Sequence, residues 1–466
     1  SARGGWAGRG QYFPKGGGGA HTFTVPDTHK NPLGDIVTTI SVSDLNEPPK
    51  RFKDTAKISD CQYVASYNWL AEISPTIAVP GQPAAWTPLK EPRRLKEDSG
   101  DYFRDINSAM LPSHPAEPAV KVVLESDPGI PLSGVDIFAC GSTFGNLLRL
   151  VQSVPKGFRF GVEVIGGTVF FSRKENDPRE LLEGVRGYGH TFPEAYTTWE
   201  GAVKGSQTHQ RIIQYGFGGL KCLVRFECDG YIKDLASSDV ALASTLDFKT
   251  TDYDLHQTLQ ATMITQPPQT IGDDVTIKCG GTVVPQKSIF DLKTRSHRKK
   301  ESFTIDEFIP QLWVKQIPNF IVAFHQSGLF RDPEIHNVKD DILKWEADKQ
   351  ADLQRLAVLI HKIVDIAHIH DDELLEVYRA ENSSDLQIRR QYGEGSQTLS
   401  PVTKAAWVQR SDFGHTDTAG GQHEESDPYE DDWHDGDDWD AASDGSERDF
   451  TACSADDCGY CGKCSY

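Results

Sequence analysis

Short apolar runs recur through the centre of the chain, each bounded by glycine or polar residues, and this pattern predicts β-strands. The apolar run 135–140 is followed by residues 144–151, whose apolar positions have helical spacing. Residues 158–164 and 168–171 flank Gly166 and Gly167, which predicts a β-hairpin. Further strands are predicted at 211–215, 221–232, 289–294 and 319–324 (the last strand), with a second hairpin at 275–278 and 282–284 and a helical turn at 180–185.

The strongest helical pattern comes after these strands, between residues 338 and 370. Apolar residues there repeat every three or four positions, as in Ile342, Trp345, Leu353, Leu356, Leu359, Ile360, Ile363 and Val364. Strands that alternate with helices and are followed by a long helix predict an α/β or α+β fold, with a mixed central sheet flanked by helices.

Composition divides the chain into one folded body and two kinds of tail. Only 38% of the 466 residues are hydrophobic, below the average of globular proteins, so we expect part of the chain to be unpacked. Residues 1–60, rich in glycine and proline, predict a flexible leader, and residues 61–400 a single large domain. Residues 410–450 predict an acidic disordered tail, and residues 451–466 a cysteine-rich end.

The net charge of −20 is concentrated near the C-terminus. Between Glu424 and Asp449 there are 13 acidic residues and one basic residue, a balance of −12, which leaves −8 for the remainder. The acidic balance therefore describes the tail and says little about what the folded body binds. We expect the tail to be a contact for a protein partner.

Targeting signals and cysteine usage predict an intracellular protein, in the nucleus, the cytoplasm or both. No apolar run approaches the roughly 20 residues that a membrane-spanning helix needs, and the first residues lack the apolar segment of a secretory signal. Cys61, Cys140, Cys222, Cys228 and Cys279 are scattered singly, which is typical of reduced thiols. We expect no membrane contact.

Two predicted strands carry acidic residues at alternate positions. Glu227 and Asp229 are two residues apart, as are Asp291 and Lys293, and side chains two apart on a strand share a face. If the strands are neighbours, three carboxylates and one ammonium group meet. Hard cations such as Mg²⁺ or Mn²⁺ take such oxygen ligands, and a bound ion activates water for phosphodiester hydrolysis. The alternative is the solvent-exposed face of an edge strand, with Lys293 paired to one acid.

E-x-D on one strand and D-x-K on another resemble the PD-(D/E)xK nucleases, and more narrowly the decapping exonuclease family of DXO and Rai1 proteins. In that family the first motif is Gly-aromatic-x-aromatic-Glu, for which residues 187–194 stand here, with Glu194 as the acid. A glutamine follows on a helix that runs into a strand, and Gln311, seven residues before Pro318, fits it. The block from Gly187 to Tyr231 also resembles uncharacterised fungal proteins.

This resemblance implies a metal-dependent hydrolase of RNA that processes or decaps 5′ ends. Glu194, Glu227, Asp229 and Asp291 would bind Mg²⁺ or Mn²⁺, while Lys293, Glu227 and Gln311 would be the catalytic residues. Two departures favour an alternative, an inactive nuclease scaffold that binds RNA in a ribonucleoprotein: Asp291 replaces the usual glutamate, and the first motif is longer. For the family's substrate-binding arginine, Arg149 and Arg159 are the candidates. A rival D-x-K, Asp247 and Lys249, lies nearer to Asp229.

Basic and aromatic residues near these motifs are candidates for contact with nucleic acid. Tyr188 is of a type that stacks on unpaired bases, and Arg211, Arg295, Arg298 and Lys299 are of a type that binds phosphates. The alternatives are core packing for Tyr188 and a solvated loop for the basic run. Residues 141–145 open a predicted helix but lack the Walker lysine, so we expect no nucleotide cofactor.

The four C-terminal cysteines form a separate candidate site. Cys453, Cys458, Cys461 and Cys464 follow the spacing C-x4-C-x2-C-x2-C, which provides enough thiolates for one tetrahedral zinc ion. A tail of free thiols is the alternative.

Overall fold

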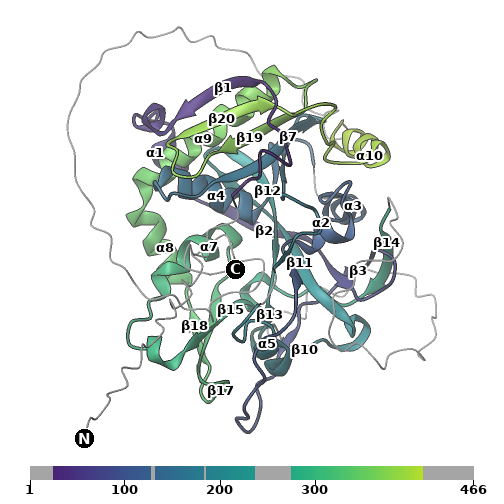
Figure 1. The fold of residues 1–466 in the computed structure, drawn as a ribbon, viewed down its shortest axis with the longest axis vertical. Helices are drawn as coiled ribbons and strands as arrows, with labels where there is room; N and C mark the ends of the chain where they lie inside the picture. The colour runs from purple at the N-terminus through teal and green to yellow at the C-terminus, as the bar shows by residue number, and fades with distance from the viewer. Residues whose placement is uncertain (1–24, 127–131, 183–184, 237–273, 413–466) are drawn as a thin grey trace, which may run out of the picture.

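Two β-sheets with helices packed on their faces form the folded body (Figure 1). This computed structural model describes residues 25–126, 132–182, 185–236 and 274–412. The predicted acidic tail and cysteine-rich end lie outside the described residues. Within the described part of the chain, the helices are all too short or too polar to cross a bilayer. The α+β class predicted from the sequence is confirmed.

The larger sheet has 11 strands and owes its two buried faces to alternation along each strand. In the central strand β12 (Leu220–Glu227), Cys222, Val224 and Phe226 enter one core, while Leu223 enters the core on the opposite face. The strands run across the sheet in the order β1 (Ile36–Ser41), β20 (Asp385–Arg390), β19 (Leu375–Arg379), β7 (Phe158–Ile165), β8 (Thr168–Arg173), β6 (Ile137–Cys140), β12, β11 (Ser206–Phe217), β2 (Ser59–Leu70), β3 (Thr76–Pro80) and β14 (Thr276–Gly280).

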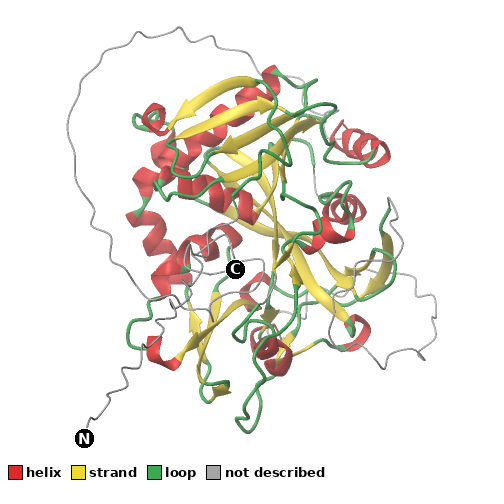
Figure 2. Cartoon of the chain, viewed as in Figure 1, coloured by secondary structure: helices red, strands yellow, loops and turns green. Residues whose placement is uncertain are grey.

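Helices cover both faces of this sheet (Figure 2). Helices α4 (Gly141–Val151) and α9 (Gln350–Ile369) share the core of one face, and α3 (Glu117–Glu125) and α10 (Pro401–Asp412) lie on the other. The long helix predicted over 338–370 is two helices, α8 (Lys339–Asp348) and α9. It breaks at Lys349 because α8 packs on α7, whereas α9 packs on the large sheet.

The smaller sheet has 7 strands and lies between two helices. Helix α7 (Ile309–Lys315) shares the core of one face with Phe320 and Val322, and α5 (Thr191–Tyr196) shares the core of the other with Phe290 and Leu292. Its strand order is β10 (Thr197–Thr198), β4 (Ala85–Trp86), β13 (Gly230–Tyr231), β15 (Ile289–Ser296), β16 (Asn319–Gln326) and β17 (Leu329–Phe330), with β18 (Glu334–Asn337) paired to β16.

Cys228 and Asp229 join the two sheets. Strand β12 ends at Glu227 in the large sheet, and β13 begins at Gly230 in the small one. Upstream, β11 and β12 form a hairpin whose turn residues, Gly218 and Gly219, both have positive φ (63° and 84°), a conformation that glycine adopts without strain. The hairpin therefore delivers Asp229 to the junction between the sheets.

Several local predictions are wrong. The leader contains β1, and the turn predicted at 180–185 contains strand β9 instead. Strand β14 pairs in parallel with β3 rather than forming a hairpin, because β3 offers a free edge of the large sheet. The strand at 319–324, which we predicted to be the last, is followed by four more strands in the described part of the chain. The remaining elements are α1 (Phe52–Thr55), β5 (Tyr102–Phe103), α2 (Ile106–Met110), β9 (Leu181–Leu182), α6 (Lys233–Ala236) and short 3-10 turns at Val42–Leu45, Gly201–Val203, Gln286–Ser288, His297–Lys299 and Ile305–Glu307.

Candidate functional site

The buried carboxylate of Asp291 is the centre of the candidate site. Asp291 and Lys293 lie on the same face of β15, as the alternation predicted, and this face packs against α7. Lys293 Nζ donates to Asp291 Oδ1 at 2.5 Å, and Gln311 Nε2 donates to Asp291 Oδ2 at 3.0 Å. The structure therefore brings Gln311 of α7 onto the carboxylate that Lys293 binds from the same strand.

Asp229 reaches the same strand from the sheet junction. Its Oδ2 accepts a hydrogen bond from the backbone N–H of Leu292, between Asp291 and Lys293, at 2.7 Å. Glu227 has a different partner: its Oε2 accepts from Gln210 Nε2 at 3.1 Å, across the hairpin where Gln210 and Glu227 are in register. The strand alternation expected to align Glu227 with Asp229 stops at Glu227, because the chain there leaves the large sheet.

Glu194 lies on the other side of the small sheet. Phe192 and Tyr196 on α5 pack with Phe290 and Leu292, whereas Asp291 and Lys293 point to the opposite face of β15. The Glu194 side chain is exposed. Its pKa is raised mainly by partial desolvation and, to a lesser extent, by the negative charge of Asp98. The structure therefore separates Glu194 from the acids it was predicted to join, because the helix that carries it covers the wrong face.

The donors that could hold a metal ion are fewer than the four predicted. Among the described residues, no group of three or more His, Cys, Asp or Glu side chains is close enough to hold one. Asp229, which accepts from the Leu292 amide, and Asp291, the neighbour of Leu292 in β15, remain as candidate ligands. Mg²⁺ is commonly held by one or two carboxylates, with waters and substrate phosphate as its other ligands. Two carboxylates are the number of protein ligands that such an ion commonly takes.

Two residues of the site were missed by the sequence reasoning. Lys315 Nζ lies 3.3 Å from Asp291 Oδ2, and Gln210 binds Glu227. Lys315 is four residues after Gln311 on α7, and this spacing places both side chains on one face of a helix. That spacing was the available signal. At the neighbouring sheet junction, burial raises the pKa of the Cys228 thiol to about 12, and the charges of Arg211 and Lys315 oppose this.

Three of the predicted nucleic-acid contacts are buried. Arg211, 1% exposed, donates to Gln286 Oε1 and to the Val284 carbonyl, both at 2.7 Å. Tyr188 packs against His325 and Phe330, so its alternative, core packing, describes it. Arg295 lies over the ring of Phe308 at 5.0 Å. A contact with nucleic acid needs an accessible side chain, so Arg211, Tyr188 and Arg295 have a structural role in the folded body.

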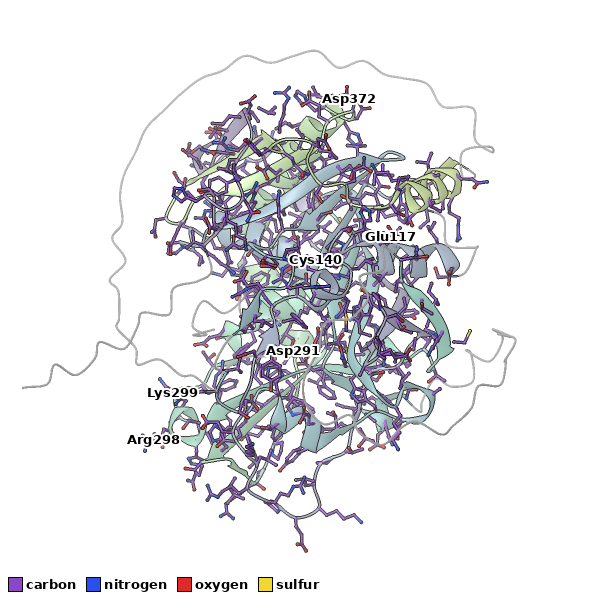
Figure 3. All side chains as sticks on the ribbon, turned by 45° about the vertical axis from the view of Figure 1, so that its right-hand side comes forward. Glu117, Cys140, Asp291, Arg298, Lys299 and Asp372 are labelled. Carbon is purple, nitrogen blue, oxygen red and sulfur yellow. The ribbon has the colours of Figure 1, made fainter. Side chains whose placement is uncertain are left out.

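Arg298 and Lys299 lie at the surface. They belong to the 3-10 turn His297–Lys299 that follows β15, and Figure 3 shows them at the periphery, away from Asp291 in the interior. The exposed position of Arg298 suits a contact with phosphate. The rival pair Asp247 and Lys249 and the four C-terminal cysteines lie outside the described residues.

A family model described as a domain of unknown function, DUF8563, matches residues 50–392. The curated proteins contain no match to the chain. Solved structures do match it over most of its length, which confirms the predicted resemblance of the fold.

Rai1 of Scheffersomyces stipitis, in complex with (3′-NADP)+ and a calcium ion, is 12% identical, with a TM-score of 0.51, over 81% of this chain and 99% of that one. Rai1 of Candida albicans, in complex with pU5 and Mn²⁺, is 11% identical, with a TM-score of 0.49, over 80% and 100%. K. lactis Dxo1, in complex with manganese, is 9% identical, with a TM-score of 0.42, over 78% and 99%. The likeness to the Scheffersomyces stipitis protein shows a shared fold.

Proposed function

Since this chain belongs to the DUF8563 family of domains of unknown function and has the Rai1-type fold, we propose that it hydrolyses phosphodiester bonds at the 5′ ends of RNA with a divalent metal ion. One observation carries the proposal. Asp229, from the junction of the two sheets, binds the backbone of β15 between Asp291 and Lys293, and Gln311 binds the same Asp291. The groups that phosphodiester hydrolysis requires thus meet at one place.

Each residue has a distinct task in this proposal. Asp229 and Asp291 would hold Mg²⁺ or Mn²⁺, which when bound lowers the pKa of water and offsets charge on the phosphate. Lys293 orients the attacking water and stabilises the added negative charge of the transition state. Gln311 fixes the rotamer of Asp291 through its amide, and Glu227 stays on the large sheet, where it is hydrogen-bonded to Gln210.

A second function is favoured by the missing third acid. With Glu194 on the other face and Asp291 engaged by two lysines, the chain would keep the nuclease scaffold as an RNA-binding protein without catalysis. Arg298 at the surface would then contact the RNA backbone. The acidic tail would recruit a protein partner, and an intracellular location in nucleus or cytoplasm belongs to both proposals.

Activity on 5′-labelled RNA separates the two functions. The full chain is incubated with Mn²⁺, and the variants Asp229→Asn and Lys293→Met are compared with Lys362→Met, a half-buried lysine on α9 outside the site. We expect product with the wild type and Lys362→Met, a loss of about a hundredfold or more in both site variants, and no product with a chelator. RNA that stays intact with every protein, yet is bound equally by all of them, would establish the scaffold instead.

A further inference from the structure

A small cavity lies at the carboxyl ends of three adjacent parallel strands, β8, β6 and β12. In sheets of parallel strands, ligands commonly bind at this end. The cavity has a volume of about 30 Å³, which is room for about two waters or one small oxyanion. Phe138 and Phe170, which line it, belong to the core that α3 shares, and Cys140, which also lines it, lies apart from Asp291 (Figure 3). The charged residues of the lining are Asp105, Arg173 and Arg225.

Arg225 is the residue of this lining with an unsatisfied donor. It is 8% exposed, and its Nη1 has no hydrogen-bond partner among the described residues. Desolvation alone would lower the pKa of Arg225, but Tyr67 and the Asp105 carboxylate raise it above its ordinary value, so the guanidinium stays charged. A buried donor without a partner is costly, and the cost is greater for a charged group. Arg225 therefore favours an acceptor in the cavity.

The other two charged groups of the lining have protein partners. Asp105 is the N-cap of α2: its Oδ1 accepts from the backbone N–H and the side-chain amide of Asn107 at 3.0 and 3.1 Å, and its Oδ2 accepts from the Ser108 hydroxyl at 3.3 Å. Arg173 forms an ion pair with Glu175. Arg225 is thus the cation of the lining that is best placed to bind an anionic ligand.

The N-terminus of helix α4 lies beside the same cavity. This helix of 11 residues begins directly after Cys140, its first turn has no acidic residue, and the Cys140 side chain makes no capping hydrogen bond. The hydroxyl groups of Ser142 and Thr143 lie 2.9 and 3.1 Å from Cys140 Sγ, so they are at this end of the helix as well. The first backbone N–H groups of a helix carry partial positive charge and commonly bind phosphate oxygens.

We propose that this cavity binds one phosphate group, held by Arg225 Nη1 and by the N-terminus of α4. A phosphate group has several acceptor oxygens and the negative charge that both donors favour, and one such group matches the size of the cavity. Inorganic phosphate and the terminal phosphate of an RNA present the same oxygens, and the experiment below distinguishes them. The proposal does not depend on a metal ion or on hydrolysis.

Titration calorimetry with inorganic phosphate tests the site in the full chain, in a chloride buffer that contains a chelator. The wild type is compared with Arg225→Met, Cys140→Asp and the control Arg390→Met, which alters an exposed arginine of β20. Arg225→Met removes the donor, and Cys140→Asp places a carboxylate at the N-cap of α4, where it competes with the ligand. We expect wild type and Arg390→Met to bind one phosphate, and the dissociation constant to rise about tenfold or more in both site variants.

Thermal melting establishes that each variant is folded, and Cys140→Asp, which adds a cap to α4, decides the question if Arg225→Met is not. An RNA decamer with a 5′-phosphate and the same RNA with a 5′-hydroxyl are added as competitors. Displacement of phosphate by the first RNA alone identifies a terminal phosphate as the ligand, and displacement by neither identifies free phosphate. A wild type that does not bind phosphate, or folded site variants that bind it as tightly as wild type, overturns the proposal. Neither result bears on the Mn²⁺-dependent cleavage assay, so the two proposals fail separately.

Discussion

Replacing Asp291 with asparagine tests whether the carboxylate holds this part of the fold together. The buried side chain accepts from Lys293, Gln311 and Lys315. Asparagine keeps the shape and one acceptor oxygen, but it presents an N–H₂ donor where a lysine or Gln311 also donates. Breaking a buried ion pair by removing one partner costs about 3–5 kcal/mol. We therefore expect Asp291→Asn to lower the free energy of unfolding by about 3 kcal/mol.

Urea unfolding of the full chain, followed by tryptophan fluorescence, measures this change. Asp177→Asn is the control, because Asp177 pairs with Lys30 at 2.8 Å on the surface, where removal of the acid should have no measurable effect. In the double variant Asp291→Asn with Lys315→Met, one of the two ammonium groups that faced the Asp291 carboxylate is gone. It should recover about 1 kcal/mol or more of the lost stability.

The reasoning fails if Asp291→Asn is as stable as wild type. It also fails if the double variant loses the sum of the two single losses, because additive losses would mean that Asp291 and Lys315 do not interact. A destabilised single variant with partial recovery in the double variant would establish the buried pair.

Four other variants test the placement of individual side chains. Glu194→Gln should leave the Mn²⁺ affinity measured by calorimetry within about twofold of wild type, because α5 covers the other face of the small sheet. Asp229→Asn should weaken Mn²⁺ binding about tenfold or more. A larger loss of affinity in Glu194→Gln than in Asp229→Asn would place α5 at the metal. Arg211→Met should lower the free energy of unfolding in urea by about 3 kcal/mol, because Gln286 Oε1 and the Val284 carbonyl lose their donor. Its RNA affinity, measured by anisotropy, should stay within about twofold of wild type. A loss of RNA binding without a loss of stability would contradict the structural role of Arg211. Burial alone would raise the pKa of Glu117, but hydrogen bonds from Ser400, Thr403 and Lys121 hold the pKa below its usual value of 4.5. The ionised Glu117 therefore stabilises the folded protein above about pH 4.5, and this stabilisation is lost as the pH falls through the lowered pKa of the folded state. Glu117→Gln should therefore melt lower at about pH 7 and lack that part of the acid dependence, and parallel melting curves for both proteins would disprove the linkage.

Alternation and helical spacing predicted the strands that carry the site. The strand at 289–294, the hairpin at 158–171 and the strand at 319–324 are all present, and their apolar side chains enter cores on both faces of the sheets. The same reasoning failed at 180–185 and 282–284, where short apolar runs lack a distinctive period. In both places the structure depends on pairing with a distant strand: β9 pairs with β5, and β14 pairs with the edge strand β3.

The site was predictable in part for the same reason. In the sequence, Asp229, Asp291, Lys293 and Gln311 occur in the motif order of the family that the sequence resembles. In the structure these residues meet at strand β15. Glu194 fits the same order equally well, yet it lies on the other face. A motif records which residue types follow one another, while the side of a sheet that a helix covers depends on packing far from the motif.

The sequence by itself determined which residues share a strand face or a helix face, because backbone geometry fixes those periods locally. Asp291 with Lys293, and Gln311 with Lys315, are pairs of this kind. Only the tertiary structure decided that α7 lies over β15, so that these pairs meet at one carboxylate, and that Arg211 is enclosed rather than exposed. Such contacts join segments far apart in the chain, and their free energies come from burial and charge that no local pattern contains.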